Sequence, residues 1–133
     1  MTKMTEVYRC AVCGAVVEVL NGGGGTLHCC GKPMERMEAH TAEQGAEKHL
    51  PVATPIEGGY RVQVGQVPHP MTNEHHIQWI EMLTSRGVHH QQLRATDKPE
   101  ALFFTTERPV AFRAYCNLHG LWLTECRATQ AAE

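Results

Sequence analysis

Four cysteines near the start of the chain place the strongest constraint on its fold. Cys10 and Cys13 form a Cys-x2-Cys pair, and Cys29 and Cys30 stand side by side after fifteen further residues. Four thiolates in two close pairs are the donor set of a tetrahedral sulfur site, which binds a structural zinc or a rubredoxin-like iron. The spacing does not choose between these metals, although adjacent cysteines depart from the second Cys-x2-Cys pair that closes a zinc ribbon.

The residues around these cysteines predict a small β module. An alternating stretch at residues 7–9 precedes the first cysteine pair, and an apolar, β-branched run at 15–20 reads as a strand. The glycine-rich residues 21–25 force a turn, and a second short strand at 26–28 leads to the second pair. The apolar residues of this module are too few to hold a fold alone. A metal therefore has to supply the missing stability. We assign this module to residues 1–37 and a polar linker or active-site loop to residues 38–48.

The remainder of the chain predicts an antiparallel β-sandwich. Segments rich in β-formers recur between turn signals at residues 52–54, 59–64, 77–83, 101–105, 110–115 and 121–126. The segment at 77–83 is ambiguous, because Ile77, Ile80 and Leu83 also fit one face of a helix. Its length favours a strand. The sequence therefore predicts an all-β protein with a second domain over residues 49–133.

Charge and hydropathy favour a globular protein of the cytoplasm. The 133 residues carry a net charge of −2 with scattered Lys and Arg, which argues against a nucleic-acid partner. No run approaches the roughly 20 apolar residues of a membrane span, and the N-terminus lacks the apolar region of a signal peptide. The six cysteines and nine histidines of such a chain are better explained as metal ligands or redox groups than as disulfides.

A second group of candidate ligands lies in the sandwich domain. Cys116 and His119 form a compact mixed pair able to place sulfur and nitrogen on one metal. His69 is held between two prolines, and His75 and His76 are neighbours with divergent side chains, so only one of them is expected to face inward. Each histidine alone is more often a surface or core residue than a ligand, and only their combination favours a metal site.

These stretches resemble a known family. EKHLPV (47–52), GGYRVQVG (58–65), VPHPMTNEHHIQWIE (67–81) and YCNLHGLW (115–122) are similar to the catalytic domain of superoxide reductases, and the cysteine module is similar to desulforedoxin. Together they resemble desulfoferrodoxin, the two-iron form of that enzyme. The resemblance implies a desulforedoxin-like module followed by an immunoglobulin-like antiparallel β-sandwich.

The resemblance also implies two iron ions per chain. The first is tetrahedral in the four-cysteine site, where zinc is the alternative metal. The second, catalytic iron is square-pyramidal with an open sixth position, and its implied ligands are His49, His69, His75, His119 and, in the axial position, Cys116. His76 is then a bystander. Lys48 would attract the superoxide anion and stabilise charge on the nascent peroxide, and Glu47 would ligate the oxidised iron after product leaves. A solvated pair on a loop is the alternative for these two residues.

The implied activity is the one-electron reduction of superoxide to hydrogen peroxide, with electrons from a rubredoxin-like donor. The family also implies a homodimer, and we expect neither nucleic acid nor membrane as a partner. The alternatives are a non-catalytic electron carrier, a structural zinc protein whose histidines store or sense metal, and a superoxide dismutase. Cys126 is expected to be a packed strand residue. Trp79 and Trp122 are expected in the core or the wall of the site.

Overall fold

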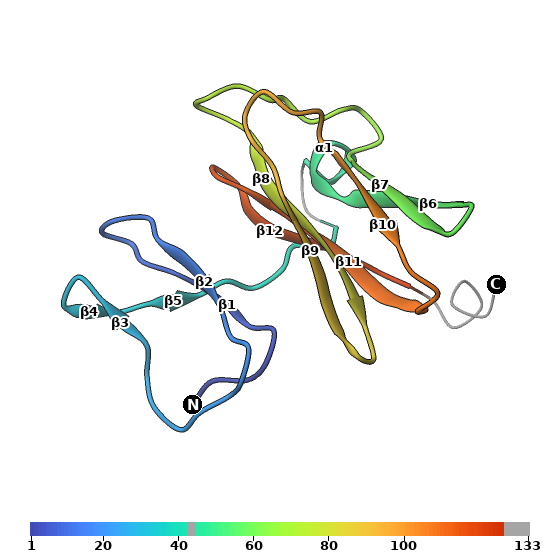
Figure 1. Cartoon of the computed structure of the whole chain (residues 1–133). Helices are drawn as coiled ribbons and strands as arrows, with labels where there is room; N and C mark the ends of the chain where they lie inside the picture. The colour runs from blue at the N-terminus through green and yellow to red at the C-terminus, as the bar shows by residue number, and fades with distance from the viewer. Residues whose placement is uncertain (43–44, 127–133) are drawn as a thin grey trace. The chain divides into compact units, whose positions relative to one another are not determined.

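The computed structural model describes residues 1–42 and 45–126 (Figure 1). Residues 43–44 of the predicted linker and 127–133 of the predicted second domain lie outside the described residues. The chain divides into two compact units, Met1–Glu38 and Ala39–Glu133. No helix in the described ranges is long and apolar enough to cross a membrane.

The first unit consists of two small β-sheets around a minimal core. Strands β1 (Val7–Arg9), β2 (Val16–Glu18) and β5 (Glu35–Arg36) form an antiparallel sheet in the order β2-β1-β5. Strands β3 (His28–Cys29) and β4 (Lys32–Pro33) form a separate hairpin. The predicted strands at 15–20 and 26–28 are therefore present but shorter or shifted. Val7, Val19 and Tyr8 are among its few buried apolar side chains, which is too little for an independent core.

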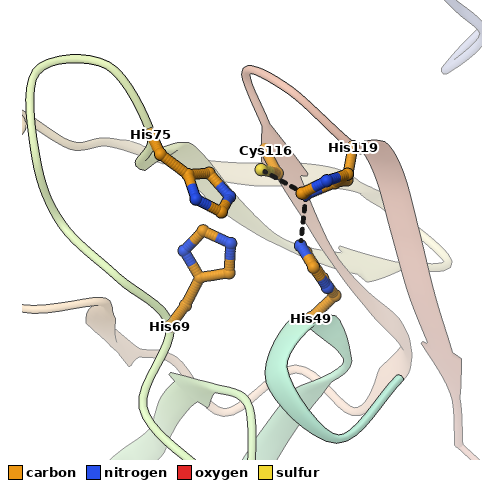
Figure 2. Close-up of side chains that lie close together, drawn as sticks. All are labelled: His49, His69, His75, Cys116 and His119. Atoms are coloured by element: carbon orange, nitrogen blue, oxygen red, sulfur yellow. Dashed lines mark hydrogen bonds between the residues drawn. The ribbon is translucent and has the colours of Figure 1, made fainter. Parts of the chain in front are cut away.

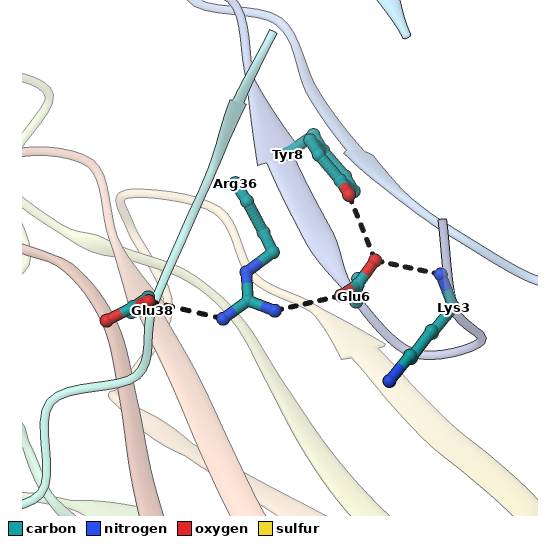
Figure 3. A network of polar contacts seen from close by, with 5 residues as sticks. All are labelled: Lys3, Glu6, Tyr8, Arg36 and Glu38. Atoms are coloured by element: carbon teal, nitrogen blue, oxygen red, sulfur yellow. Dashed lines mark hydrogen bonds and ion pairs between the residues drawn. The ribbon is translucent and has the colours of Figure 1, made fainter. Parts of the chain in front are cut away.

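A polar network at the surface joins β1 to β5 (Figure 3). One carboxylate oxygen of Glu6 accepts hydrogen bonds from the Lys3 backbone N–H at 2.8 Å and the Tyr8 hydroxyl at 2.9 Å. Its other oxygen pairs with Arg36 at 2.9 Å, and Arg36 also pairs with Glu38 at 3.2 Å. The backbone bond from Lys3 and the bond from Tyr8 lower the pKa of Glu6. The carboxylate of Glu6 therefore links the start of β1 to β5 through its contacts with Tyr8 and Arg36.

The second unit is a sandwich of two antiparallel sheets. Strands β6 (Pro51–Ile56), β7 (Gly59–Val64) and β10 (Glu100–Phe104) form one sheet in the order β10-β7-β6. Strands β8 (Ile77–Thr84), β9 (Gly87–Gln92), β11 (Pro109–Cys116) and β12 (Gly120–Glu125) form the other in the order β12-β11-β8-β9. The buried core draws on both sheets: Val62, Val64, Ala101 and Phe103 from the first, and Ile77, Ile80, Met82, Phe112, Ala114 and Cys116 from the second. The predicted all-β sandwich is confirmed.

The ambiguous segment at 77–83 is a strand. It pairs with β9 on one side and β11 on the other, and Ile80 and Met82 enter the core. Trp79 and Glu81, on the other face, are also buried, which explains why the sequence shows no clean alternation. Strand β9 was not predicted, because its sequence GVHHQQ is mostly polar and only half-buried or exposed.

A short helix, α1 (Ala46–His49), lies where the sequence predicted linker and loop. Its preceding residue, Gly45, has a φ of 95°, a conformation that glycine adopts without strain. The helix is joined to the end of β7 by a hydrogen bond of 2.9 Å from the Gly65 N–H to the Leu50 carbonyl. Gly65 thereby connects the segment that carries His49 to the loop that leads to His69.

The change Gly65→Ala is expected to lower the free energy of unfolding by about 2–4 kcal/mol. The φ of Gly65 is 85°, and a Cβ there would collide with the Val67 carbonyl oxygen and lie 2.7 Å from the Lys48 carbonyl oxygen. Gly58→Ala is the control, because its φ is 84° but its nearest neighbour is the Phe104 ring at 3.8 Å. Chemical denaturation of both variants measures the difference. Equal losses would show that the close packing at Gly65 adds nothing to the backbone strain.

Candidate metal centres

The four cysteines of the first unit gather into one cluster. Their sulfur atoms lie within 4.8 Å of one another, and all four thiols are free. The Cys13 and Cys29 sulfurs are 3.6 Å apart, and the Cys29 and Cys30 sulfurs are 3.9 Å apart. Cys30 has a φ of 53°, a backbone conformation that residues other than glycine seldom adopt. This backbone conformation lets two adjacent cysteines direct both sulfurs to the same place.

The cysteines of this cluster differ in pKa. A hydrogen bond from the Cys13 backbone N–H to the Cys10 sulfur, 3.4 Å long, lowers the pKa of Cys10 to about 6. The pKa of Cys29 is raised to about 12, first by its hydrogen bond with Cys13 and then by the one with Cys10. The backbone N–H therefore favours the thiolate form of Cys10, which is the form that binds metal.

Five side chains of the second unit form another cluster at one end of the sandwich (Figure 2). One potential donor atom from each lies within 4.8 Å of all the others. The residues are His49 at the end of α1, His69 and His75 in the loop between β7 and β8, Cys116 at the end of β11, and His119 in the turn before β12. The structure thus brings together every residue that the resemblance implied as a ligand of the catalytic iron.

The hydrogen bonds of the imidazoles show which nitrogen faces the centre. His49 donates from Nδ1 to the Gly45 carbonyl at 2.9 Å, and His69 donates from Nδ1 to the Pro70 carbonyl at 2.7 Å. Their Nε2 atoms are therefore left for a metal. Among the described residues, the buried Nε2 atoms of His69 and His75 have no hydrogen-bond partner. Buried polar atoms of this kind need a partner, and a metal ion at the centre fits that need.

His119 presents its other ring nitrogen to the same centre. Its Nδ1 lies 3.1 Å from His49 Nε2 and 3.7 Å from the Cys116 sulfur (Figure 2). The donor set is therefore three Nε2 atoms, one Nδ1 atom and one sulfur. Imidazole and thiolate together suit iron, zinc or copper better than magnesium or calcium, so the residues present fit the iron of the resembling family.

Burial keeps three of the histidines neutral. Desolvation lowers the pKa of His69 to about 4 and also lowers the pKa values of His49 and His75. Desolvation raises the pKa of Cys116, while the backbone N–H groups of His119 and Leu118 donate to its sulfur and act in the opposite direction. At neutral pH the imidazoles of His49, His69 and His75 are ready to bind a metal, whereas the Cys116 thiol has to lose a proton first.

Trp122 forms part of the wall of the cluster. Its indole stacks on the His49 ring with centroids 4.6 Å apart and an interplanar angle of 16°. Its Nε1 donates to the His119 carbonyl at 3.1 Å. One side chain therefore restrains two of the five residues, and the prediction that Trp122 lies in the core or the wall of the site is confirmed. Cys126 packs against the hydrophobic core, as predicted, but it follows the end of β12 and is not a strand residue.

Glu47 and Lys48 are exposed on α1 and do not belong to the five-residue group. The positive charge of Lys48 helps to lower the pKa of His75, after desolvation and the neighbouring His119 and His76. Glu47 lines a cavity of about 750 Å³ whose lining contains none of the five donors. His76 is also outside the group, and its Nδ1 donates to the Thr72 carbonyl at 3.0 Å.

The pKa shifts predict that metal binding to this cluster releases about one proton near pH 7, and that the proton comes from Cys116. His49, His69 and His75 release none, because their lowered pKa values leave them neutral. Calorimetric titration with Zn²⁺ in buffers of different ionisation enthalpy counts the protons, in a Cys13→Ser, Cys30→Ser background that lacks the first cluster. Cys116→Ser should abolish the release. Undiminished release in that variant would mean that another group supplies the proton.

Comparison with known proteins agrees with the two clusters. Residues 41–125 match the desulfoferrodoxin family, and residues 2–37 match the desulfoferrodoxin N-terminal domain. The chain is 48% identical over 125 residues to a desulfoferrodoxin from Syntrophotalea carbinolica, covering 94% of this chain and 99% of that relative. It is 36% identical over 98 residues to a superoxide reductase from Pyrococcus horikoshii, covering 59% of this chain and 85% of the relative.

The fold matches a solved structure over nearly the whole chain. The crystal structure of the superoxide reductase from Treponema pallidum aligns with a TM-score of 0.78 at 25% sequence identity, covering 93% of this chain and all of that one. The resemblance seen in the sequence is thus confirmed by full-length relatives. The chain belongs to the desulfoferrodoxin family.

Proposed function

We propose that this chain is a superoxide reductase, which reduces superoxide with one electron and two protons to hydrogen peroxide. The observation that carries the proposal is the cluster of four imidazoles and one thiol, with two buried imidazole nitrogens that have no partner among the described residues. The superoxide reductases of Pyrococcus horikoshii and Treponema pallidum, to which the chain is similar, support the same activity.

The five side chains would hold an iron ion as its protein ligands. Iron held there would supply the single electron that superoxide accepts, and five protein donors would leave room for one small ligand. His49, His69 and His75, which burial keeps neutral, would leave the lower oxidation state of the iron accessible. A Cys116 thiolate would donate electron density to the metal. The cluster is reached from solvent, because His119 is exposed and His75 is only half-buried.

Lys48 is proposed to guide the anionic substrate. Its ammonium group is exposed, and its charge acts on His75, one of the five donors. A positive charge at the entrance of a site raises the encounter rate with an anion and stabilises negative charge that develops there. Glu47, its exposed neighbour, is proposed to become a ligand of the oxidised metal after product leaves. This would require its side chain to turn away from the cavity that it lines.

The four-cysteine cluster is proposed to hold a second iron that is accessory to the reaction or relays electrons. Its donor set fits iron and zinc equally. We further propose residues 1–37 as the module for this metal and residues 49–133 as the catalytic domain. A rubredoxin-like electron donor and a homodimeric, cytoplasmic protein complete the proposal, on the strength of the family alone.

The stoichiometry of the reaction tests the proposal. Iron-loaded, reduced protein supplied with an electron donor is expected to form one hydrogen peroxide for each superoxide consumed, without dioxygen. Peroxide is measured by a peroxidase-coupled assay and dioxygen with an electrode. Half as much peroxide with matching dioxygen would identify a dismutase. Consumption no faster than the spontaneous rate would return the chain to the electron carriers or structural metal proteins.

The change Lys48→Ala is expected to lower the second-order rate constant for superoxide about tenfold at low salt and to weaken its dependence on ionic strength. Pulse radiolysis measures this rate constant. Arg86→Ala is the matched control, because it removes one exposed positive charge at the end of β8 opposite to the site. A rate constant unaffected by Lys48→Ala, or affected equally by Arg86→Ala, would contradict steering by Lys48.

A further inference from the structure

Asn117 connects two segments that carry metal-binding side chains. It lies in the turn between Cys116 and His119, and it contacts the loop that carries His75. Its backbone N–H donates to the His76 carbonyl at 3.2 Å, and its Oδ1 accepts from the His76 N–H at 2.9 Å. Its Nδ2 donates to the Glu74 carbonyl at 2.9 Å. Asn117 therefore binds the backbone of the residues on both sides of His75, Glu74 and His76.

These bonds continue the sheet beyond its last pair of residues. Strands β8 and β11 pair up to Ile77 opposite Cys116, with an irregular register between Tyr115 and Cys116. Asn117 then faces His76 as the next antiparallel pair would, but its side-chain oxygen takes the role of a backbone carbonyl. The main chain is thereby released from the ladder and can turn back to present His119.

The ring of His75 depends on the loop backbone for its orientation more than the rings of His49 and His69 do. His49 and His69 are oriented by hydrogen bonds from Nδ1 to the carbonyls of Gly45 and Pro70. Within the described ranges, no such bond orients the ring of His75, and its buried Nε2 lacks a partner. Metal-binding imidazoles normally gain their orientation from a bond to the other ring nitrogen. For His75, the loop backbone has to provide it.

We propose that Asn117 is a positioning residue that holds His75 in place toward the metal bound by Cys116 and His119, although it donates no ligand itself. The inference rests on the proposed function, because it requires a metal at the five-residue cluster. An asparagine suits this role, since one short side chain accepts from the His76 N–H and donates to the Glu74 carbonyl. Aspartate retains only the acceptor, and alanine retains neither.

The release of metal from the full-length chain tests the proposal. The protein is loaded with Co²⁺, and the absorption bands that Cys116→Ser removes report the five-residue cluster. Asn117→Ala is expected to release Co²⁺ to excess EDTA about 10- to 100-fold faster than the unchanged chain. Asn117→Asp should also release Co²⁺ faster, because a carboxylate oxygen cannot donate to the Glu74 carbonyl and is repelled by it. Release at the unchanged rate in both variants would overturn the proposal.

Asn73→Ala is the matched control. Asn73 is an exposed asparagine in the same loop, and no hydrogen bond from its side chain is present in the described structure. Its replacement should leave the release rate within about twofold, a surface effect. The thermal midpoint of the metal-free chain is measured alongside. If Asn117→Ala speeds Co²⁺ release only as much as its lowered thermal midpoint explains, Asn117 contributes to general stability. That result would overturn a specific positioning role.

A double-mutant comparison tests whether Asn117 acts through His75. In a His75→Ala background, Asn117→Ala should change the release rate by less than about twofold, because the residue that it positions is gone. An undiminished effect in that background would contradict action through His75. If the unchanged chain shows no cobalt bands that depend on Cys116, the proposed metal centre itself fails. If those bands are present but Asn117→Ala has no effect, only the role of Asn117 fails.

Discussion

The second unit is organised by a conflict between burial and hydrogen bonding at one end of the sandwich. Imidazole nitrogens of His69 and His75 are buried without a partner among the described residues, which costs free energy unless another group meets them. Carbonyls hold the outer nitrogens of His49 and His69, so these rings cannot turn to relieve the conflict. A metal ion resolves it, and the surrounding loops are best understood as the frame that aims five donors at one point.

The first unit also depends on a metal-binding cluster, but for a different reason. Its apolar core is minimal, so its fold depends on the four sulfurs and on a surface network centred on Glu6. The two clusters nevertheless differ in preparation. Cys10 is already favoured as a thiolate by a backbone N–H, whereas Cys116 is held as a thiol by burial. The first site thus offers a thiol that loses its proton more readily, and the second offers neutral imidazoles.

The frame around the histidines is built from backbone contacts at element ends. Gly65 joins α1 to β7, Trp122 restrains His49 and His119, and Asn117 joins the turn after β11 to the loop before β8. None of these residues is a metal donor. Trp122 was expected in the core or the wall of the site, but nothing in the local spacing of Gly65 or Asn117 distinguishes them from ordinary loop residues. Sequence reasoning therefore named the donors and missed most of this supporting set.

The sequence by itself determined the all-β class, most strands, the two groups of metal-binding residue types and the family resemblance. These follow from local pattern, because alternation predicts strands and paired cysteines predict a sulfur site. Helix α1 escaped it because it is a single turn held by a contact with the end of β7. Strand β9 escaped it because it is a mostly polar strand at the edge of its sheet, paired with the preceding strand β8. Residue spacing alone left open which of His75 and His76 faces the cluster, and only the resemblance pointed to His75. The tertiary structure supplies the physical reason, because the backbone N–H of His76 is held by Asn117, 41 positions away.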